Sequence, residues 1–193
     1  MISGTRRVSA ALALAWALAA FGAEPWTLER LLAGFAAQRE SRASFVEKKT
    51  VQVLERPLVS SGELRYEAPD RLEKRTLRPK PELLRLEGDT LTLERGDERL
   101  RLDLRSYPEA AAFVQSIRGT LAGDQAGLER AYRLHLEGAA SSWALTLTPR
   151  EAGMASLVES VRIAGRRADV SVIEIRYASG DRTLMSVQRL GGR

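Results

Sequence analysis

The side chains able to do chemistry are few in this sequence of 193 residues. His135 is the single histidine and there is no cysteine, so a zinc site built from the usual histidine and cysteine ligands is not expected. Ser141 and Ser142 follow His135 closely, but they lack the Gly-x-Ser-x-Gly turn that exposes a nucleophilic serine in α/β-hydrolases. Acidic pairs such as Asp97 with Glu98 lie at predicted turns, where solvation accounts for them. We therefore predict no enzyme activity, no metal and no cofactor.

The amino-terminal stretch has the pattern of a cleaved export signal. Two arginines precede an uncharged run rich in Ala and Leu, and this run ends at Glu24. The run is shorter than the roughly 20 residues of a spanning helix, and Gly22 and Ala23 are small enough for signal peptidase. We predict a signal peptide over 1–23, cleaved near Gly22 or Ala23, and a periplasmic domain over 24–193. An uncleaved membrane anchor is the alternative, since the following residues stay fairly apolar.

The composition is that of an ordinary folded protein, with 44% hydrophobic and 28% charged residues. Without the two leader arginines, 28 basic side chains remain against 25 acidic ones, a formal net charge of +3. Basic and acidic residues are interleaved along the chain, whereas a nucleic-acid site needs a patch of one sign. We expect no nucleic-acid partner. Because there is no cysteine to carry a lipid anchor, we expect a monomer free in its compartment.

Hydrophobic periodicity predicts one helix followed by many short strands. Leu28, Leu31, Leu32 and Phe35 lie on one side of a helix that begins near Thr27. Short alternating runs follow, separated by Pro, Gly or Asp. The eleven predicted strands cover residues 45–54, 58–67, 71–77, 82–87, 90–94, 99–104, 132–137, 142–148, 157–164, 170–178 and 182–189.

A second helical segment interrupts the strands. Pro108 suits its first turn, Gly123 suits its end, and Asp124 can cap a shorter helix that follows. The apolar stripe of this segment comprises Ala110, Phe113, Val114, Ile117 and Leu121. Closely joined strands pair antiparallel, and leucines spaced two apart make one face of the sheet apolar. The predicted class is α+β. Its interior is either filled by side chains or left hollow beneath the helices.

Several local strings, taken in order, resemble the LolA family of periplasmic carriers of outer-membrane lipoproteins. They are ASFVE at residues 43–47, SGELRYEAPDRL at 61–72, LAGD at 121–124, WALTLTP at 143–149 and GDRT at 180–183. The resemblance covers about residues 26–189, and the sequence looks closest to a divergent branch of the family associated with other lipid-export systems.

This resemblance implies an incomplete antiparallel β-barrel of about eleven strands, with helices covering an apolar cavity for acyl chains. Well-known members have an arginine before the proline of the second string, and it holds the helical lid shut. Ala68 occupies that position here. Arg65 or Arg71 could replace the missing latch.

On this basis we predict a carrier that moves a lipid or lipoprotein toward the outer membrane, with an inner-membrane exporter and an outer-membrane acceptor as partners. The alternatives are an envelope sensor on the same fold, which would bind lipidated or misfolded proteins, and a hydrolase that depends on His135. The side chains predicted to line the acyl cavity are Leu64, Tyr66, Leu72, Leu86, Leu91, Leu93, Phe113, Val114, Ile117 and Trp143.

Overall fold

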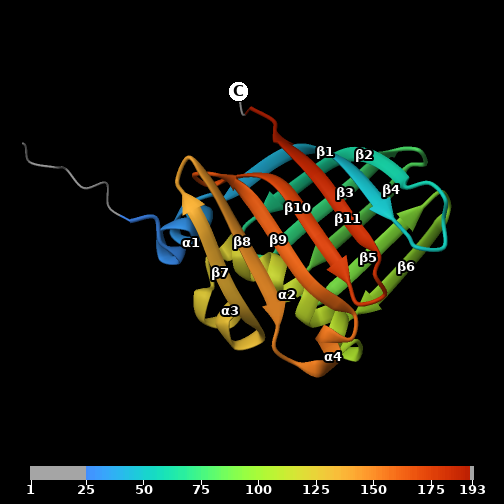
Figure 1. Ribbon diagram of the computed structural model, residues 1–193. Coiled ribbons are helices and arrows are strands. Elements are labelled where there is room, and N and C mark those ends of the chain that lie inside the picture. The colour runs from blue at the N-terminus through green and yellow to red at the C-terminus, as the bar shows by residue number, and fades with distance from the viewer. Residues whose placement is uncertain (1–24, 192–193) are drawn as a thin grey trace, which may run out of the picture.

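The computed structural model describes residues 25–191, which form one antiparallel sheet with helices on one side (Figure 1). The predicted leader over 1–23 lies outside the described residues. The helices are α1 (Leu28–Ala36), η1 (Leu104–Ser106, a 3₁₀ turn), α2 (Pro108–Ala122), α3 (Gln125–Ala131) and α4 (Ala152–Ala155). The strands are β1 (Glu40–Thr50), β2 (Leu58–Glu67), β3 (Arg71–Arg78), β4 (Glu82–Glu87), β5 (Thr90–Arg95), β6 (Glu98–Asp103), β7 (Tyr132–Ala139), β8 (Ser142–Pro149), β9 (Val158–Arg166), β10 (Asp169–Tyr177) and β11 (Arg182–Arg189).

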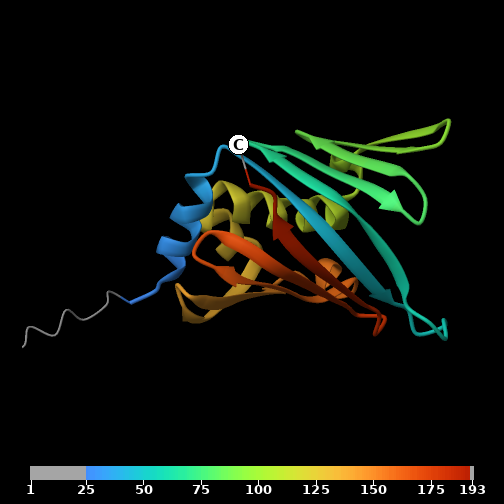
Figure 2. The ribbon, with the colours of Figure 1, turned by 90° about the horizontal axis from the view of Figure 1, so that it is seen from above.

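The sheet is a long meander whose first and last strands meet in the middle. Its strand order is β6-β5-β4-β3-β2-β1-β11-β10-β9-β8-β7, and every neighbouring pair is antiparallel. β6 and β7 are the two edges, so the barrel is incomplete. Figure 2 shows the sheet bent into two arms with α2 between them. The predicted α+β class and the incomplete barrel of eleven strands are confirmed.

The helix ends follow the predicted capping chemistry. The hydroxyl of Thr27 accepts a hydrogen bond from the backbone N–H of Arg30 and caps α1. Gly123 ends α2 with a φ of 73°, a left-handed conformation that favours glycine. Asp124 accepts from the N–H of Gly127 at 2.9 Å and caps α3. In residues 25–191, no helix has both the length and the apolar composition that crossing a bilayer requires.

The buried side of α2 differs from the predicted apolar stripe. Ser116 and Thr120 are each only 2% exposed, whereas Ile117 is 37% exposed. Gly119 lies against Leu128 of α3, and a Cβ at Gly119 would be 3.1 Å from that side chain. Because α2 and α3 come so close at Gly119, the side of α2 that carries small residues is the side that packs. The two buried hydroxyls are satisfied by carbonyls of their own helix, which keeps their burial inexpensive.

A packed core fills the half of the sheet around β7–β10. It contains buried side chains of α1, α3, α4 and β7–β9, namely Leu31, Leu32, Phe35, Leu128, Tyr132, Trp143, Leu145, Leu147, Met154, Val158, Val161 and Ile163, with partly buried side chains of β10 packed against them. Full burial of each leucine contributes about 1.5–3 kcal/mol. This half therefore supplies much of the apolar stabilisation of the fold.

Gly62 allows β2 and β3 to approach each other at a bulge on the concave side. Ser61 pairs with Arg78 and Gly62 pairs with Thr76, so the register shifts between them. A Cβ at Gly62 would lie 1.9 Å from the carbonyl oxygen of Arg75. No side chain fits at this position unless β3 moves.

We expect Gly62→Ala to lower the free energy of unfolding by about 1–3 kcal/mol, the usual cost of overpacking a well-fitted site. Urea unfolding followed by circular dichroism measures it. Gly191→Ala is the matched control, because nothing lies within 4 Å of a Cβ there. An unchanged midpoint for Gly62→Ala would mean that β2 and β3 lie farther apart than described.

Candidate ligand-binding site

Leucines form two rows across the concave face of β2 to β6. Residues directly opposite each other on paired strands share a face, so the strand registers define the rows. The first row is Tyr66, Leu72, Leu86, Leu91 and Leu102, and the second is Leu64, Lys74, Leu84, Leu93 and Leu100. The six strand residues predicted from β2 to β5 to line a cavity are thus brought together on one surface.

This surface is only partly covered. Tyr66 and Leu86 are each 4% exposed, but Leu100 is 50% exposed, and most of the remaining leucines of the two rows are half-buried. Burial raises the pKa of Tyr66 above its ordinary value. Its hydroxyl donates to the carbonyl of Pro69. The contrast with the packed half around β7–β10 shows an apolar surface that the protein itself does not fill.

α2 lies between the two arms of the bent sheet (Figure 2). Within the described chain, its backbone lies closest to α1, α3, α4 and η1. Phe113 packs beside the core, and Val114 and Ile117 are partly exposed on the same helix. The predicted helical site residues therefore differ in cover, with Phe113 against the packed half and Ile117 open to water.

Trp143 lies in the packed half. It is 3% exposed, its ring meets Phe35 edge-on with centroids 5.9 Å apart, and its indole N–H donates to the carbonyl of Arg167 at 2.8 Å. In this structure protein atoms enclose it on all sides, so its role in ligand contact stays a prediction.

A cleft of about 430 Å³ opens beside α2 at the end of the molecule where β1 finishes. Its volume falls within the usual range for small-molecule sites. Phe113 is the predicted site residue that lines it. The complete lining is Lys49, Phe113, Met154, Ser156, Leu157, Val158, Tyr177, Ser179 and Asp181.

Charged groups also occupy the concave face, which the sequence patterns did not indicate. Glu47 and Lys74 form an ion pair of 2.7 Å, with side chains 18% and 27% exposed. Ser60 donates to the same glutamate, and the Lys74 ammonium lies 5.1 Å from the ring centroid of Phe45. Glu47 is two residues from Phe45, and this period-two spacing was the signal that could have placed it inside.

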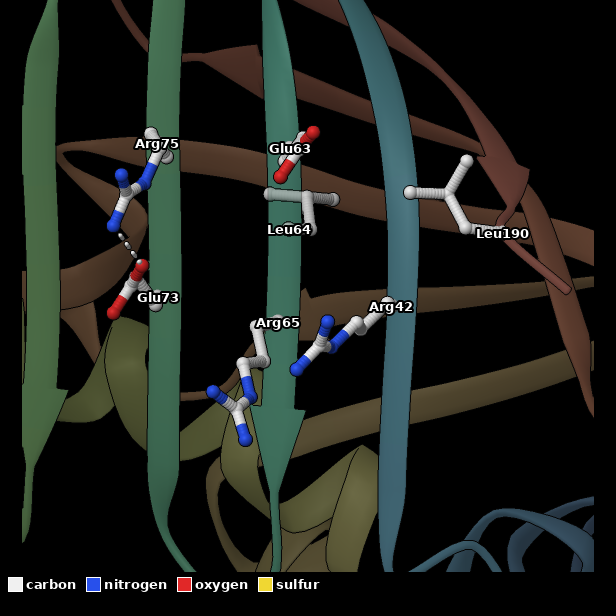
Figure 3. Close-up of a pocket in the computed structure, with 7 residues that line it drawn as sticks. All are labelled: Arg42, Glu63, Leu64, Arg65, Glu73, Arg75 and Leu190. Atoms are coloured by element: carbon white, nitrogen blue, oxygen red, sulfur yellow. Dashed lines mark hydrogen bonds and ion pairs between the residues drawn. The ribbon is translucent and has the colours of Figure 1, made fainter. Parts of the chain in front are cut away.

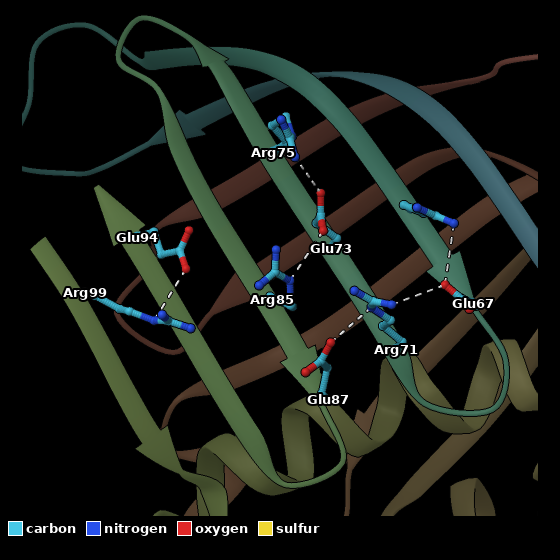
Figure 4. A network of polar contacts seen from close by, with 9 residues as sticks. Glu67, Arg71, Glu73, Arg75, Arg85, Glu87, Glu94 and Arg99 are labelled. Atoms are coloured by element: carbon cyan, nitrogen blue, oxygen red, sulfur yellow. Dashed lines mark hydrogen bonds and ion pairs between the residues drawn. The ribbon is translucent and has the colours of Figure 1, made fainter. Parts of the chain in front are cut away.

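Arg71 lies on the convex face (Figure 4), and Arg65 lies on the same face of β2 (Figure 3). Arg65 pairs with Glu40 and Glu67 at 3.0 and 3.5 Å, and Arg71 pairs with Glu67 and Glu87 at 3.6 and 3.1 Å. Each of these partners belongs to a strand. The role of either arginine as a lid latch stays a prediction, and the structure gives it no support from these pairs.

The convex face also has a shallow groove of about 160 Å³ (Figure 3). The arginines of this groove already form ion pairs. Arg42 and Arg65 both pair with Glu40, and Arg75 pairs with Glu73 at 3.2 Å. We interpret it as part of the exposed ion-pair lattice of this face. It has little charge left for an anionic ligand.

A helix-to-sheet contact comes from Arg118, which sequence reasoning did not select. Its guanidinium donates to the carbonyl of Gly88 at 2.6 Å and lies 3.9 Å from the carboxylate of Asp89, in the turn between β4 and β5. Ala68, at the position of the family arginine, donates its backbone N–H to the carbonyl of Arg39, which lies between α1 and β1. Arg118 thus connects α2 to the open arm of the sheet.

His135 lies on the convex side of β7 with its side chain 71% exposed, and its Nε2 is 3.2 Å from Glu137. Ser142 begins the next strand, directly after the turn. Among residues 25–191, no group of three or more histidine or carboxylate side chains is placed to hold a metal ion.

Comparison with known proteins identifies a family. The family described as "Outer membrane lipoprotein carrier protein LolA-like" matches residues 19–189. A search of curated proteins found no significant match.

Solved structures with a similar arrangement are distant in sequence. A LolA superfamily protein from Nitrosomonas europaea is 12% identical with a TM-score of 0.47, over 87% of this chain and 95% of that one. The matched chain in the Pseudomonas aeruginosa MucA/MucB complex is 15% identical with a TM-score of 0.48, over 86% of this chain and 58% of that chain. Lipoprotein LppX from Mycobacterium tuberculosis is 11% identical with a TM-score of 0.42, over 82% and 93%.

The family match spans most of the chain and agrees with the incomplete barrel described above. The chain belongs to the LolA-like family of outer membrane lipoprotein carrier proteins.

Proposed function

We propose that this protein is a periplasmic carrier that binds the acyl chains of a lipid or lipoprotein and moves them toward the outer membrane. The observation that carries the proposal is the pair of leucine rows on β2 to β6, which are left partly exposed on the concave side of the sheet. Family membership supports the same function.

Binding draws its free energy from the removal of hydrocarbon from water. Each methylene buried contributes about 0.8 kcal/mol, so a short stretch of acyl chain on the leucine rows suffices for measurable affinity. The convex face of β2 to β4 carries ion pairs, whereas the concave face of the same strands carries the leucine rows. Acyl chains therefore bind on the concave side.

For the bound acyl chains to leave, the helical cover over the concave side has to open. α2 acts as the lid in this proposal, and the hydrogen bond from Arg118 to Gly88 holds it over the open arm. Arg118 thus takes the part that the sequence suggested for Arg65 or Arg71. Cargo received from an inner-membrane exporter passes to an outer-membrane acceptor that binds it more tightly, so the transfer needs no nucleotide at this protein.

The direct test is native mass spectrometry of the protein purified from the periplasm of its host. We expect a bound species that an organic extract identifies as an acyl lipid. Protein that is free of lipid and also fails to bind a fluorescent fatty acid would refute the carrier proposal. Recovery of a regulatory protein in place of lipid would favour the sensor alternative.

Neighbouring leucines on β4 give a matched test of the binding face. Leu84 lies on the concave side, and Leu83 lies on the convex side with similar burial. We expect Leu84→Gln to weaken fluorescent fatty-acid binding about fivefold, because a polar group then faces the hydrocarbon. Fluorescence titration measures the change.

Leu83→Gln should bind as the wild type does. Thermal unfolding of both variants checks that they are folded. Equal losses for the two variants, or a loss confined to Leu83→Gln, would place the ligand elsewhere.

The proposed latch predicts a change in lid motion. Arg118→Ala removes a charge-assisted hydrogen bond, so we expect amide hydrogen exchange in α2 to increase about five- to tenfold and bound fatty acid to leave faster. Arg130→Ala, an exposed arginine on α3, is the control. If α2 exchanges equally slowly in wild type and Arg118→Ala, this contact is not the latch.

A further inference from the structure

Lys49 is the cationic side chain among the described residues that line the cleft. Phe45, Glu47 and Lys49 share the concave face of β1, and Lys49 is paired in register with Thr183 of β11. Its ammonium lies 5.7 Å from the ring centroid of Tyr177, which also lines the cleft. The lysine is half-buried, and apolar side chains of α2, α4 and β10 surround the same space.

No carboxylate of the described chain lies within 4 Å of the Lys49 ammonium. Glu47 is paired with Lys74 at 2.7 Å. Asp181 also lines the cleft, and its carboxylate accepts a hydrogen bond from the backbone N–H of Gln52 at 3.1 Å, a bond that does not neutralise it. The aromatic face of Tyr177 attracts the cation but does not neutralise its charge. This positive charge is available to an anionic group entering the cleft.

The remaining lining is suited to hydrocarbon. Phe113, Leu157 and Val158 contribute apolar surface, and Leu157 is 51% exposed at the opening. A ligand that matches both the cation and the apolar lining of the cleft therefore has an anionic end and an apolar body. The volume of about 430 Å³ fits part of a single chain better than several chains side by side.

We propose that the cleft binds the head-group end of a single-chain anionic amphiphile, with a carboxylate or phosphate beside Lys49 and the hydrocarbon against Phe113 and Leu157. The proposal rests on the carrier function and specifies its ligand class. Lys74 is excluded from this role because Glu47 already neutralises it. Charge attraction in a partly desolvated cleft adds to hydrocarbon burial, so the anionic form binds more tightly than a neutral analogue of equal length.

The test compares an anthroyloxy-labelled stearic acid with its methyl ester. We expect the wild type to bind the acid more tightly than the ester, and Lys49→Gln to weaken acid binding about fivefold while leaving ester binding unchanged. Lys49→Arg keeps the charge and should retain tight binding of the acid. Lys48→Gln is the matched control, because Lys48 is the next residue on β1 and points to the convex face.

Competition distinguishes the two anions. Unlabelled fatty acid and unlabelled alkyl phosphate are each titrated against the bound acid probe, and displacement by either supports the head-group site. Displacement by neither would overturn it. Thermal unfolding confirms that each variant is folded.

The results that would refute the head-group proposal differ from those that would refute the carrier function. A wild type that binds acid and ester equally, or a Lys49→Gln variant that loses both or neither, overturns the head-group proposal and leaves the carrier function standing. A wild type that binds neither probe refutes the carrier function itself.

Discussion

The described helices cover the two halves of the concave face unequally. α1, α3 and α4 pack on β7–β10, where Leu145 and Leu147 have lost all contact with water. Across β2–β6, most leucines of the same face are only half-buried, and Leu100 is half exposed. Partly covered apolar surface gains free energy from any hydrocarbon placed on it. The unequal coverage leaves one half tightly packed and the other half with apolar surface open to water, where the proposed function places the ligand.

Apolar and polar residues are separated along the concave face of β2–β6. The rows that begin at Tyr66 and Leu64 are mainly leucine. In the next row, nearer the cleft, Gly62 lies opposite Thr76 and Thr76 lies opposite Glu82. The carboxylate of Glu82 pairs with Arg95. An apolar end and a polar end therefore lie on one concave face, and this arrangement suits a ligand that is itself amphiphilic.

Sequence patterns located the elements because turn residues and alternation are local properties. β2, β4 and β11 begin and end at the predicted residues. β1 begins at Glu40, five residues before the prediction, because its polar start shows no apolar alternation and becomes a strand only by pairing with β2. α4 has four residues, too few for a periodic pattern. The stripe chosen on α2 was not the buried side, since the contact of Gly119 with Leu128 decides the packing.

By itself, the sequence determined the class, the number and order of strands, the caps of α1 and α3, and the set of leucines that share a face. These features depend on residues close together along the chain. Only the tertiary structure decided which half of the face is filled and that Trp143 belongs to the packed half. It also decided that Arg118 joins α2 to the sheet and that Lys49 lies in a cleft beside Tyr177. These features depend on contacts between segments far apart in sequence, and they were settled by packing and charge pairing that no local pattern records.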